Sequence, residues 1–193
     1  TKVVFCPRGV TSAKVLDGVT EIGDSAFFMC FDLESVKLPD TLKVVGKGAF
    51  QYDEALTECE LPKGLETVKD SAFFGAENWT GVDRIPSTVK TIGAYGFAEC
   101  KGSKLTIPEG ITKIEEFSFW GYEEGLEEIN LPSTLKIIGN SAFSWAKDVK
   151  KLVIPEGVTS IGAEAFARLD SLESLTLPST LQEIGSKAFM GKE

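Results

Sequence analysis

Residues 175–189 read LTLPSTLQEIGSKAF, and the same frame recurs along the whole chain. Its proline is repeated at 22- to 24-residue intervals, at Pro39, Pro62, Pro86, Pro108, Pro132, Pro155 and Pro178, and Leu16 stands in the equivalent place at the start. We call this place the proline position. Proline fixes φ near −65°, and the residues that follow it favour a turn, so each proline position predicts a turn between two extended segments.

A phenylalanine follows every proline position at a constant distance of eleven residues, at Phe27, Phe50, Phe73, Phe97, Phe119, Phe143, Phe166 and Phe189. An Ile or Val stands six residues after the proline position, and the pattern L-x-x-L-x-L precedes it, most clearly at Leu172, Leu175 and Leu177. One such unit cannot bury its own apolar face, whereas stacked units can. The sequence therefore predicts a repeat solenoid of about eight coils of 23 residues, with the phenylalanines as a buried spine.

Two departures from a simple repeat stand out. Two residues after the proline position, Gly and Thr alternate strictly, at Gly18, Thr41, Gly64, Thr88, Gly110, Thr134, Gly157 and Thr180. This alternation predicts growth by duplication of a two-repeat unit. The leucine pattern is also irregular in one copy, where Trp79, Val82 and Ile85 replace it.

Composition excludes several classes of function. The 193-residue chain has a net charge of −9, which opposes binding to nucleic acid, and it contains no histidine. The lack of histidine removes histidine-based catalytic triads and histidine-ligated metal sites. No run of 18 apolar residues occurs, so no membrane-spanning segment is predicted. We expect no catalytic site, no metal site and no cofactor.

The residues after the spine phenylalanines are the candidate binding residues. They form one lateral edge of the predicted rod and comprise Trp79, Trp120, Tyr122, Glu123, Glu124 and Trp145. Aromatic side chains there favour recognition of a protein or a glycan, and the alternative is that they fill gaps in the core. Glu123 and Glu124 have no obvious basic partner, whereas Glu128 is expected beside Lys104.

The cysteines are expected to behave mainly as buried thiols. Cys59 occupies a place that Leu or Ile fills elsewhere, and a disulfide between Cys6 and Cys30 in neighbouring coils is the alternative left open.

Residues 16–189 resemble the BspA-like (Treponema pallidum-type) leucine-rich-repeat family, whose pattern is L-x-x-L-x-L-P followed by I-G-x-x-A-F-x-x-C. The final Cys of that pattern occurs here only at Cys30 and Cys100. The resemblance implies a leucine-rich-repeat right-handed superhelix, β-rich with short helical or irregular turns. We expect a single domain over residues 1–193, with 1–15 as an atypical N-terminal cap or partial repeat and 16–193 as eight repeats. Because the chain starts at Thr1, we expect it to be processed or part of a longer surface protein.

The same resemblance implies an extracellular or cell-surface location in a host-associated bacterium or other microbe. The leading hypothesis is a non-catalytic protein-interaction or adhesion module with a protein or glycan partner, which the host would supply. The alternative is a structural spacer or scaffold domain of a larger surface protein. The incomplete last repeat favours end-to-end self-association of such a domain.

Overall fold

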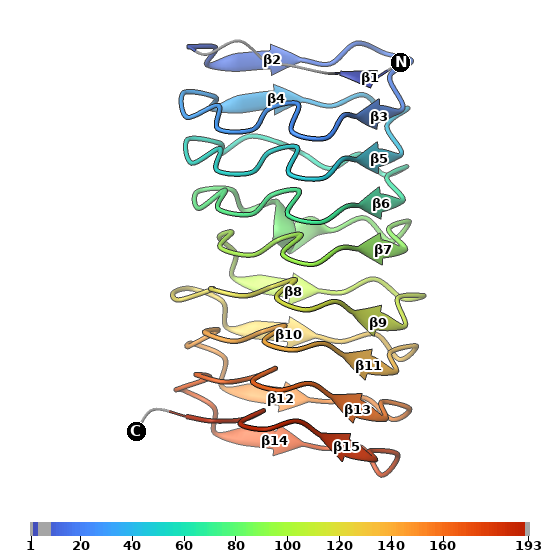
Figure 1. The fold of residues 1–193 in the computed structure, drawn as a ribbon, viewed down its shortest axis with the longest axis vertical. Helices are drawn as coiled ribbons and strands as arrows, with labels where there is room; N and C mark the ends of the chain where they lie inside the picture. Colours follow the sequence, from blue (N-terminus) through green and yellow to red (C-terminus); the bar gives the residue numbers. More distant parts are fainter. Residues whose placement is uncertain (1, 4–8, 192–193) are drawn as a thin grey trace.

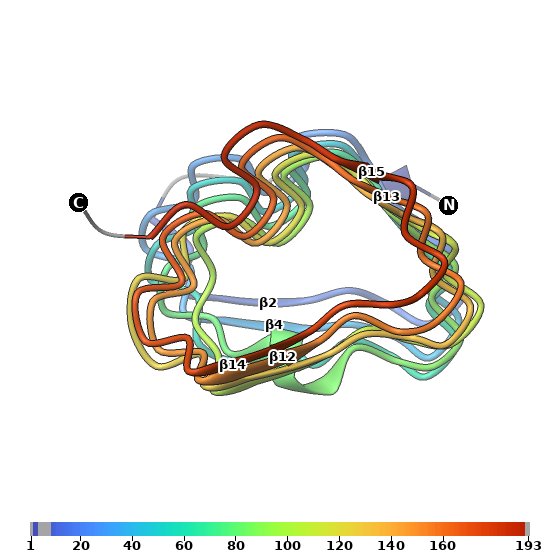
Figure 2. The ribbon, with the colours of Figure 1, turned by 90° about the horizontal axis from the view of Figure 1, so that it is seen from below.

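The computed structural model describes residues 2–3 and 9–191, and it is a β-solenoid of about eight turns with about 23 residues in each (Figure 1). Each regular coil places one short strand on each of two faces. Apart from β1 (Lys2–Val3), the strands of the first face end at the Ile or Val six residues after the proline position. The strands of the second face precede the proline position. The remaining residues form a third side without strands, the turn face (Figure 2). The predicted architecture is confirmed.

Neighbouring strands pair in parallel through equivalent residues, for example Val45 with Val68 and Val68 with Ile92. The first-face strands are β1 (Lys2–Val3), β3 (Glu21–Ile22), β5 (Val44–Val45), β6 (Thr67–Val68), β7 (Thr91–Ile92), β9 (Lys113–Ile114), β11 (Ile137–Ile138), β13 (Ser160–Ile161) and β15 (Glu183–Ile184). The second-face strands are β2 (Ser12–Lys14), β4 (Ser35–Lys37), β8 (Lys104–Thr106), β10 (Glu128–Asn130), β12 (Lys151–Val153) and β14 (Ser174–Thr176). Among the described strands, the pairing breaks between β7 and β9 on the first face and between β10 and β12 on the second. β1 pairs with β3 and β2 with β4, and the assignment of residues 1–15 to a cap or partial repeat stays a prediction.

The phenylalanine column forms the centre of the core, as predicted. Rings of successive coils stack nearly parallel from Phe27 to Phe189, with centroids 4.9–5.9 Å apart. This spacing follows from the ladder of backbone hydrogen bonds, which sets neighbouring coils about 4.8 Å apart. Phe50 and Phe143 are fully buried, whereas Phe189 in the last coil is half-buried because no further described coil covers it.

The alternation of Gly and Thr has a structural reason. Gly18 has a φ of +88°, its N–H donates to Thr41 Oγ1 at 3.1 Å, and the Thr41 hydroxyl donates to the carbonyl of Val19 at 2.8 Å. The same arrangement recurs at Gly110 with Thr134 and at Gly157 with Thr180. A threonine side chain thus clamps the turn of the preceding coil, and the two coils form a pair, which fits the two-repeat period of the sequence.

The second face is interrupted in the copy that the sequence shows as irregular. After β4, the next coil contributes only the isolated bridge between Ser35 and Glu58. The following coil has no strand on this face; the 3-10 helix η1 (Gly81–Arg84) takes its place (Figure 1). Regular pairing resumes between β8 and β10.

Candidate functional site

The backbone of the turn face is left-handed at two places in nearly every coil, nine and thirteen residues after the proline position. Four of these places carry aromatic side chains, at Tyr52, Tyr95, Phe117 and Trp145, with φ of 60°, 56°, 56° and 73°. This conformation costs a non-glycine residue about 1–2 kcal/mol. Hydrogen bonds between coils offset the cost, because each amide donates to a carbonyl of the next coil, as Tyr52 does to Phe74 at 2.8 Å.

Five aromatic side chains form a continuous row on the turn face, which we call the aromatic strip. Its members are Phe28, Tyr52, Phe74, Tyr95 and Phe117, one from each of five successive coils, and their ring centroids are 6.3, 5.2, 5.5 and 4.6 Å apart in that order. Phe28 is 40% exposed and the other four are half-buried. The strip is therefore a second aromatic column, distinct from the buried spine and accessible from solvent.

None of the strip's five members is among the candidate binding residues named from the sequence, and two of them lie outside the segment that was considered. Tyr95 and Phe117 precede their spine phenylalanines by two residues, whereas the candidates were sought only after the spine. Other coils have Ser25, Ser71 and Ser141 at the same left-handed place. A large aromatic side chain where other copies carry serine is the signal that would have identified them.

Two of the candidate rings belong to the core. Trp79 is 1% exposed, stacks on Phe73 with a centroid separation of 4.2 Å, and donates from Nε1 to the carbonyl of Cys59 at 2.8 Å. Tyr122 is also 1% exposed, and its hydroxyl donates to the carbonyl of Phe97 at 2.8 Å. Burial raises the pKa of the Tyr122 phenol. The expectation that these two rings lie on an accessible edge is corrected: each fills an interior gap and finds a carbonyl for its polar atom.

Trp145 and Glu123 meet through a shared lysine. Lys147 Nζ lies 4.9 Å from the Trp145 ring centroid, and the Arg168 guanidinium carbon lies at the same distance. Lys147 also donates to Glu123 Oε2 at 2.7 Å. The expectation that Glu123 lacks a basic partner is thus wrong, because the coil rise brings a residue 24 positions later beside it. The cations occupy positions over the Trp145 ring that a sugar would need for stacking.

Trp120 is half-buried and Glu124 is exposed, so both are accessible from solvent, as expected for surface residues. Near them, burial, together with repulsion from Glu77 and Glu123, raises the pKa of Glu99. Among residues 2–3 and 9–191, no group of acidic or cysteine side chains is arranged to hold a metal ion. The expected ion pair of Lys104 with Glu128 is present at 3.0 Å.

The cysteine side chains that the structure describes are buried. Burial raises the pKa of Cys59 and of Cys100, the opposite of what a nucleophilic thiolate requires. Cys6, and with it the disulfide left open for Cys30, lies outside the described residues. The buried position of Cys59 is the one expected from its place in the repeat.

A buried carboxyl group was not anticipated. Asp53 is fully buried; its Oδ1 accepts the Cys30 N–H at 2.8 Å, and its Oδ2 has no hydrogen-bond partner among the described residues. Burial raises the pKa of Asp53 to about 8. In the repeat, Asp53 takes the place that Cys30 and Cys100 occupy in other coils, so the polar side chain at a small apolar position was the available signal.

Comparison with known structures supports the fold. A leucine-rich repeat protein from Bacteroides ovatus ATCC 8483 superimposes with a TM-score of 0.85 and is 26% identical over 90% of this chain. This chain covers 47% of that protein, about half its length. The Treponema pallidum leucine-rich repeat protein TpLRR superimposes with a TM-score of 0.55 and is 23% identical to this chain. The match covers 91% of this chain and 73% of TpLRR, and the two share the fold. A leucine-rich cell surface protein from Faecalibacterium prausnitzii A2-165 is 21% identical over 89% of this chain and 74% of its own, with a TM-score of 0.38.

Comparison with curated proteins gives no match. No helix in the described part of the chain has the length and apolar character needed to cross a membrane. The BspA-type leucine-rich repeat region, in contrast, matches residues 2–84 and 83–193, which together span nearly the whole sequence. The repeat frame, the solenoid and this match agree, and the chain belongs to the BspA-type leucine-rich repeat family.

Proposed function

We propose that the chain is a non-catalytic, protein-binding module of a secreted or cell-surface protein, and that the aromatic strip is its contact surface. The strip carries the proposal, because it places partly exposed rings of five successive coils in one uninterrupted row. Tyrosine and other aromatic side chains dominate the binding energy of many protein interfaces. The surface location follows the family resemblance, and a host-derived partner is part of the same proposal.

The arrangement of the rings favours a protein over a glycan as the partner. A sugar stacks on the free face of an aromatic ring, but the Tyr95 and Phe117 rings cover each other, and the other contacts of the strip are tilted by 47–59° rather than presenting one flat surface. Tyr95 and Phe117 are parallel, with an interplanar angle of 4°. The ring edges and side-chain flanks that remain suit burial against apolar side chains of another protein.

The chemistry of the site supports binding rather than catalysis. The sequence has no histidine, and burial raises the pKa of the Cys59 and Cys100 thiols. The Glu123 carboxylate, which is adjacent to Glu124 in the sequence, forms an ion pair with Lys147.

The test is a binding screen on an array of purified extracellular matrix proteins and glycans. We expect saturable binding of the wild-type chain to a protein, and at least about a tenfold loss of affinity in the double variant Tyr95→Ser, Phe117→Ser. Serine is the residue of other coils at this left-handed place, so the fold should persist. Val153→Ser, at a 46% exposed apolar residue on the second face, is the matched control. Equal binding by the double variant and the wild type, or no saturable binding by the wild type, would refute the proposal.

A second candidate, the structural spacer, is favoured by the last described coil. That coil exposes apolar side chains whose equivalents are buried in most other coils: Leu175 is 39% exposed and Ile184 is 50% exposed. A second solenoid stacked on this end would cover them and pair with β15. Sedimentation velocity at rising protein concentration tests this function: self-association that Ile184→Lys abolishes supports it, and a monomer at all concentrations contradicts it.

A further inference from the structure

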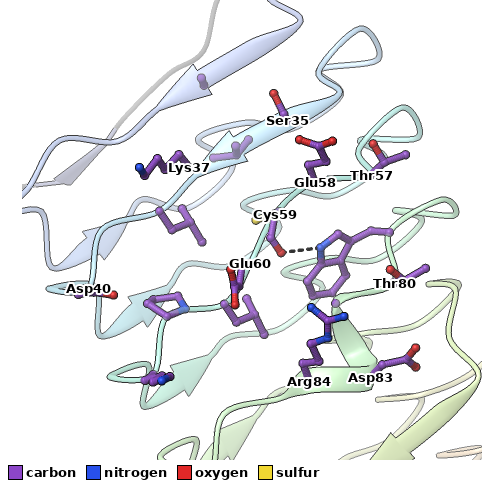
Figure 3. A pocket seen from close by; sticks show the side chains of 18 residues that line it. Ser35, Lys37, Asp40, Thr57, Glu58, Cys59, Glu60, Thr80, Asp83 and Arg84 are labelled. Atoms are coloured by element: carbon purple, nitrogen blue, oxygen red, sulfur yellow. Dashed lines mark hydrogen bonds between the residues drawn. The ribbon is translucent and has the colours of Figure 1, made fainter.

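On the second face, the described chain has no strand between β4 and β8; the segment around Glu58 forms one isolated bridge with β4, and the coil after it has none. In that coil, η1 replaces the strand, and the side chain of Trp79 fills the core beneath it. Gly81 makes room for this indole, because a Cβ atom at Gly81 would overlap the Trp79 ring. The dashed line in Figure 3 marks the hydrogen bond from the indole to the carbonyl of Cys59. The gap is thus fixed by a specific packing of Trp79 and Gly81.

The segment that borders this gap has two amides without an acceptor among the described residues, whereas its Cys59 carbonyl is already bonded by the Trp79 indole. At three places on the second face, the residue after a strand donates to the next coil: Val15 to Lys37 at 2.9 Å, Ile107 to Asn130 at 3.0 Å and Ile154 to Thr176 at 2.9 Å. Leu131, after β10, does not form this bond, but there the next coil has the strand β12. The equivalent bond from Leu38 to Glu60 does not form. Among the described residues, no backbone group accepts a hydrogen bond from the amide of Cys59 or of Leu61. In a parallel ladder these alternate amides point to the same side, and here that side is the gap towards η1.

The opposite side of the gap is closed. Asp83 Oδ1 accepts hydrogen bonds from the amides of Ser103 and Lys104, at 3.0 and 3.1 Å. These two amides lie at the start of β8. The Asp83 carboxylate therefore supplies the hydrogen-bond acceptor that a strand in the preceding coil would otherwise provide. The open edge therefore consists of residues 59–61, and its free amides point towards η1.

A groove of about 790 Å³ lies over this open edge, within the size range of ligand sites (Figure 3). Its charged rim includes Lys37, Lys63 and Arg84, but the side chains directly on the open strand are Glu58 and Glu60. Both carboxylates are exposed, and neither forms an ion pair with another described residue. They stand two residues apart on the same side of the strand, where a neighbouring strand would present alternate side chains to them.

We propose that this groove binds an extended peptide segment, which adds a strand beside residues 59–61 and carries basic side chains at alternate positions next to Glu58 and Glu60. Backbone pairing with the free amides supplies the affinity, and the two carboxylates supply the selectivity. The groove lies on the second face and the aromatic strip lies on the turn face, so this site goes beyond the proposed function and does not depend on it.

The probe is a fluorescein-labelled synthetic peptide, acetyl-Thr-Lys-Val-Lys-Val-Lys-Thr-amide, titrated with the whole chain and followed by fluorescence anisotropy. A peptide with glutamate in place of lysine reports the role of charge. Two further peptides carry N-methyl groups on one or the other set of alternate amides. Since a strand bonds one neighbour through alternate residues, only one of these two isomers should lose binding.

The protein variants separate the groove from the general negative charge of the chain. The double variant Glu58→Lys, Glu60→Lys should weaken binding of the lysine peptide by about tenfold or more. The double variant Glu127→Lys, Glu173→Lys makes the same charge change at exposed residues outside the groove and should retain the affinity. Peptide binding should also slow hydrogen exchange at the amides of Cys59 and Leu61.

Three results would overturn the proposal. One is the absence of saturable binding up to millimolar peptide. Another is equal binding of both N-methylated isomers and the parent, which would show attraction by charge alone. The third is equal weakening by the two double variants. A failed matrix-protein screen would leave this result unaffected, because the peptide titration reads only the groove.

Discussion

Replacing Asp53 by Asn should remove a pH dependence from the stability of the fold. Burial raises the pKa of Asp53 from an ordinary value of 3.8 to about 8. Between these values the folded protein keeps a proton that the unfolded chain has released, so the free energy of unfolding falls as the pH rises. The slope is about 1.4 kcal/mol per pH unit, and the loss reaches roughly 4 kcal/mol at pH 7 relative to acid. Above pH 8 both states have lost the proton, and the contribution becomes constant.

The Asn variant does not ionise in this range and keeps an oxygen for the Cys30 N–H. It instead buries an amide N–H₂ at the unpartnered position of Oδ2, which costs about 1–3 kcal/mol. We therefore expect the variant to be less stable than the wild type near pH 4.5 and more stable near pH 7.5.

The assay is urea unfolding followed by tryptophan fluorescence at pH 4.5, 5.5, 6.5 and 7.5. The quantity that matters is the difference between wild type and variant at each pH, because shifts at other groups, such as the raised pKa of Glu99, cancel in this difference. A difference that stays constant across the four pH values would refute the conclusion that Asp53 is protonated in the folded protein.

Further predictions concern the core, the clamps and the tryptophans. Phe143→Ala should lower the free energy of unfolding by about 3–5 kcal/mol, since the ring is fully buried between two neighbours; an effect below 1 kcal/mol in urea unfolding would contradict the spine. Thr134→Val keeps the shape but removes both hydrogen bonds of the clamp on Gly110, and should cost about 1–3 kcal/mol by the same assay. In single-tryptophan variants, acrylamide should quench Trp120 strongly and Trp79 weakly, and equal quenching of the two would contradict the described burial.

The repeat frame could be predicted from the sequence because it depends on residues at fixed spacing. The constant distance to the spine phenylalanines specified the coil, and the ring stacking observed from Phe27 to Phe189 follows from it. The alternation of Gly and Thr indicated a two-coil unit, and the clamp of Thr41 on Gly18 supplies its physical basis.

The surface could be predicted only in part, because exposure depends on contacts between coils. Trp79 fills the core beneath η1, and both Trp79 and Tyr122 are buried with their polar atoms donating to a backbone carbonyl. Glu123 gains Lys147 as a partner only after the coil rise brings residues 24 positions apart together. An aromatic residue at Tyr95, where other copies carry serine, is a signal in the sequence, but its place in the row depends on the left-handed backbone and on ring contacts between coils.

The aromatic strip as a contact surface is tested most directly by hydroxyl-radical footprinting with mass spectrometry, on the free chain and on its complex with the matrix protein captured in the array. In the free chain, Tyr52, Phe74, Tyr95 and Phe117 should be oxidised, whereas the buried Trp79 should be protected. In the complex, the four strip residues should lose most of their reactivity while Val153 on the second face keeps its own. Unchanged oxidation of the strip, with protection confined to the second face or to the last coil, would contradict the proposal that the strip binds.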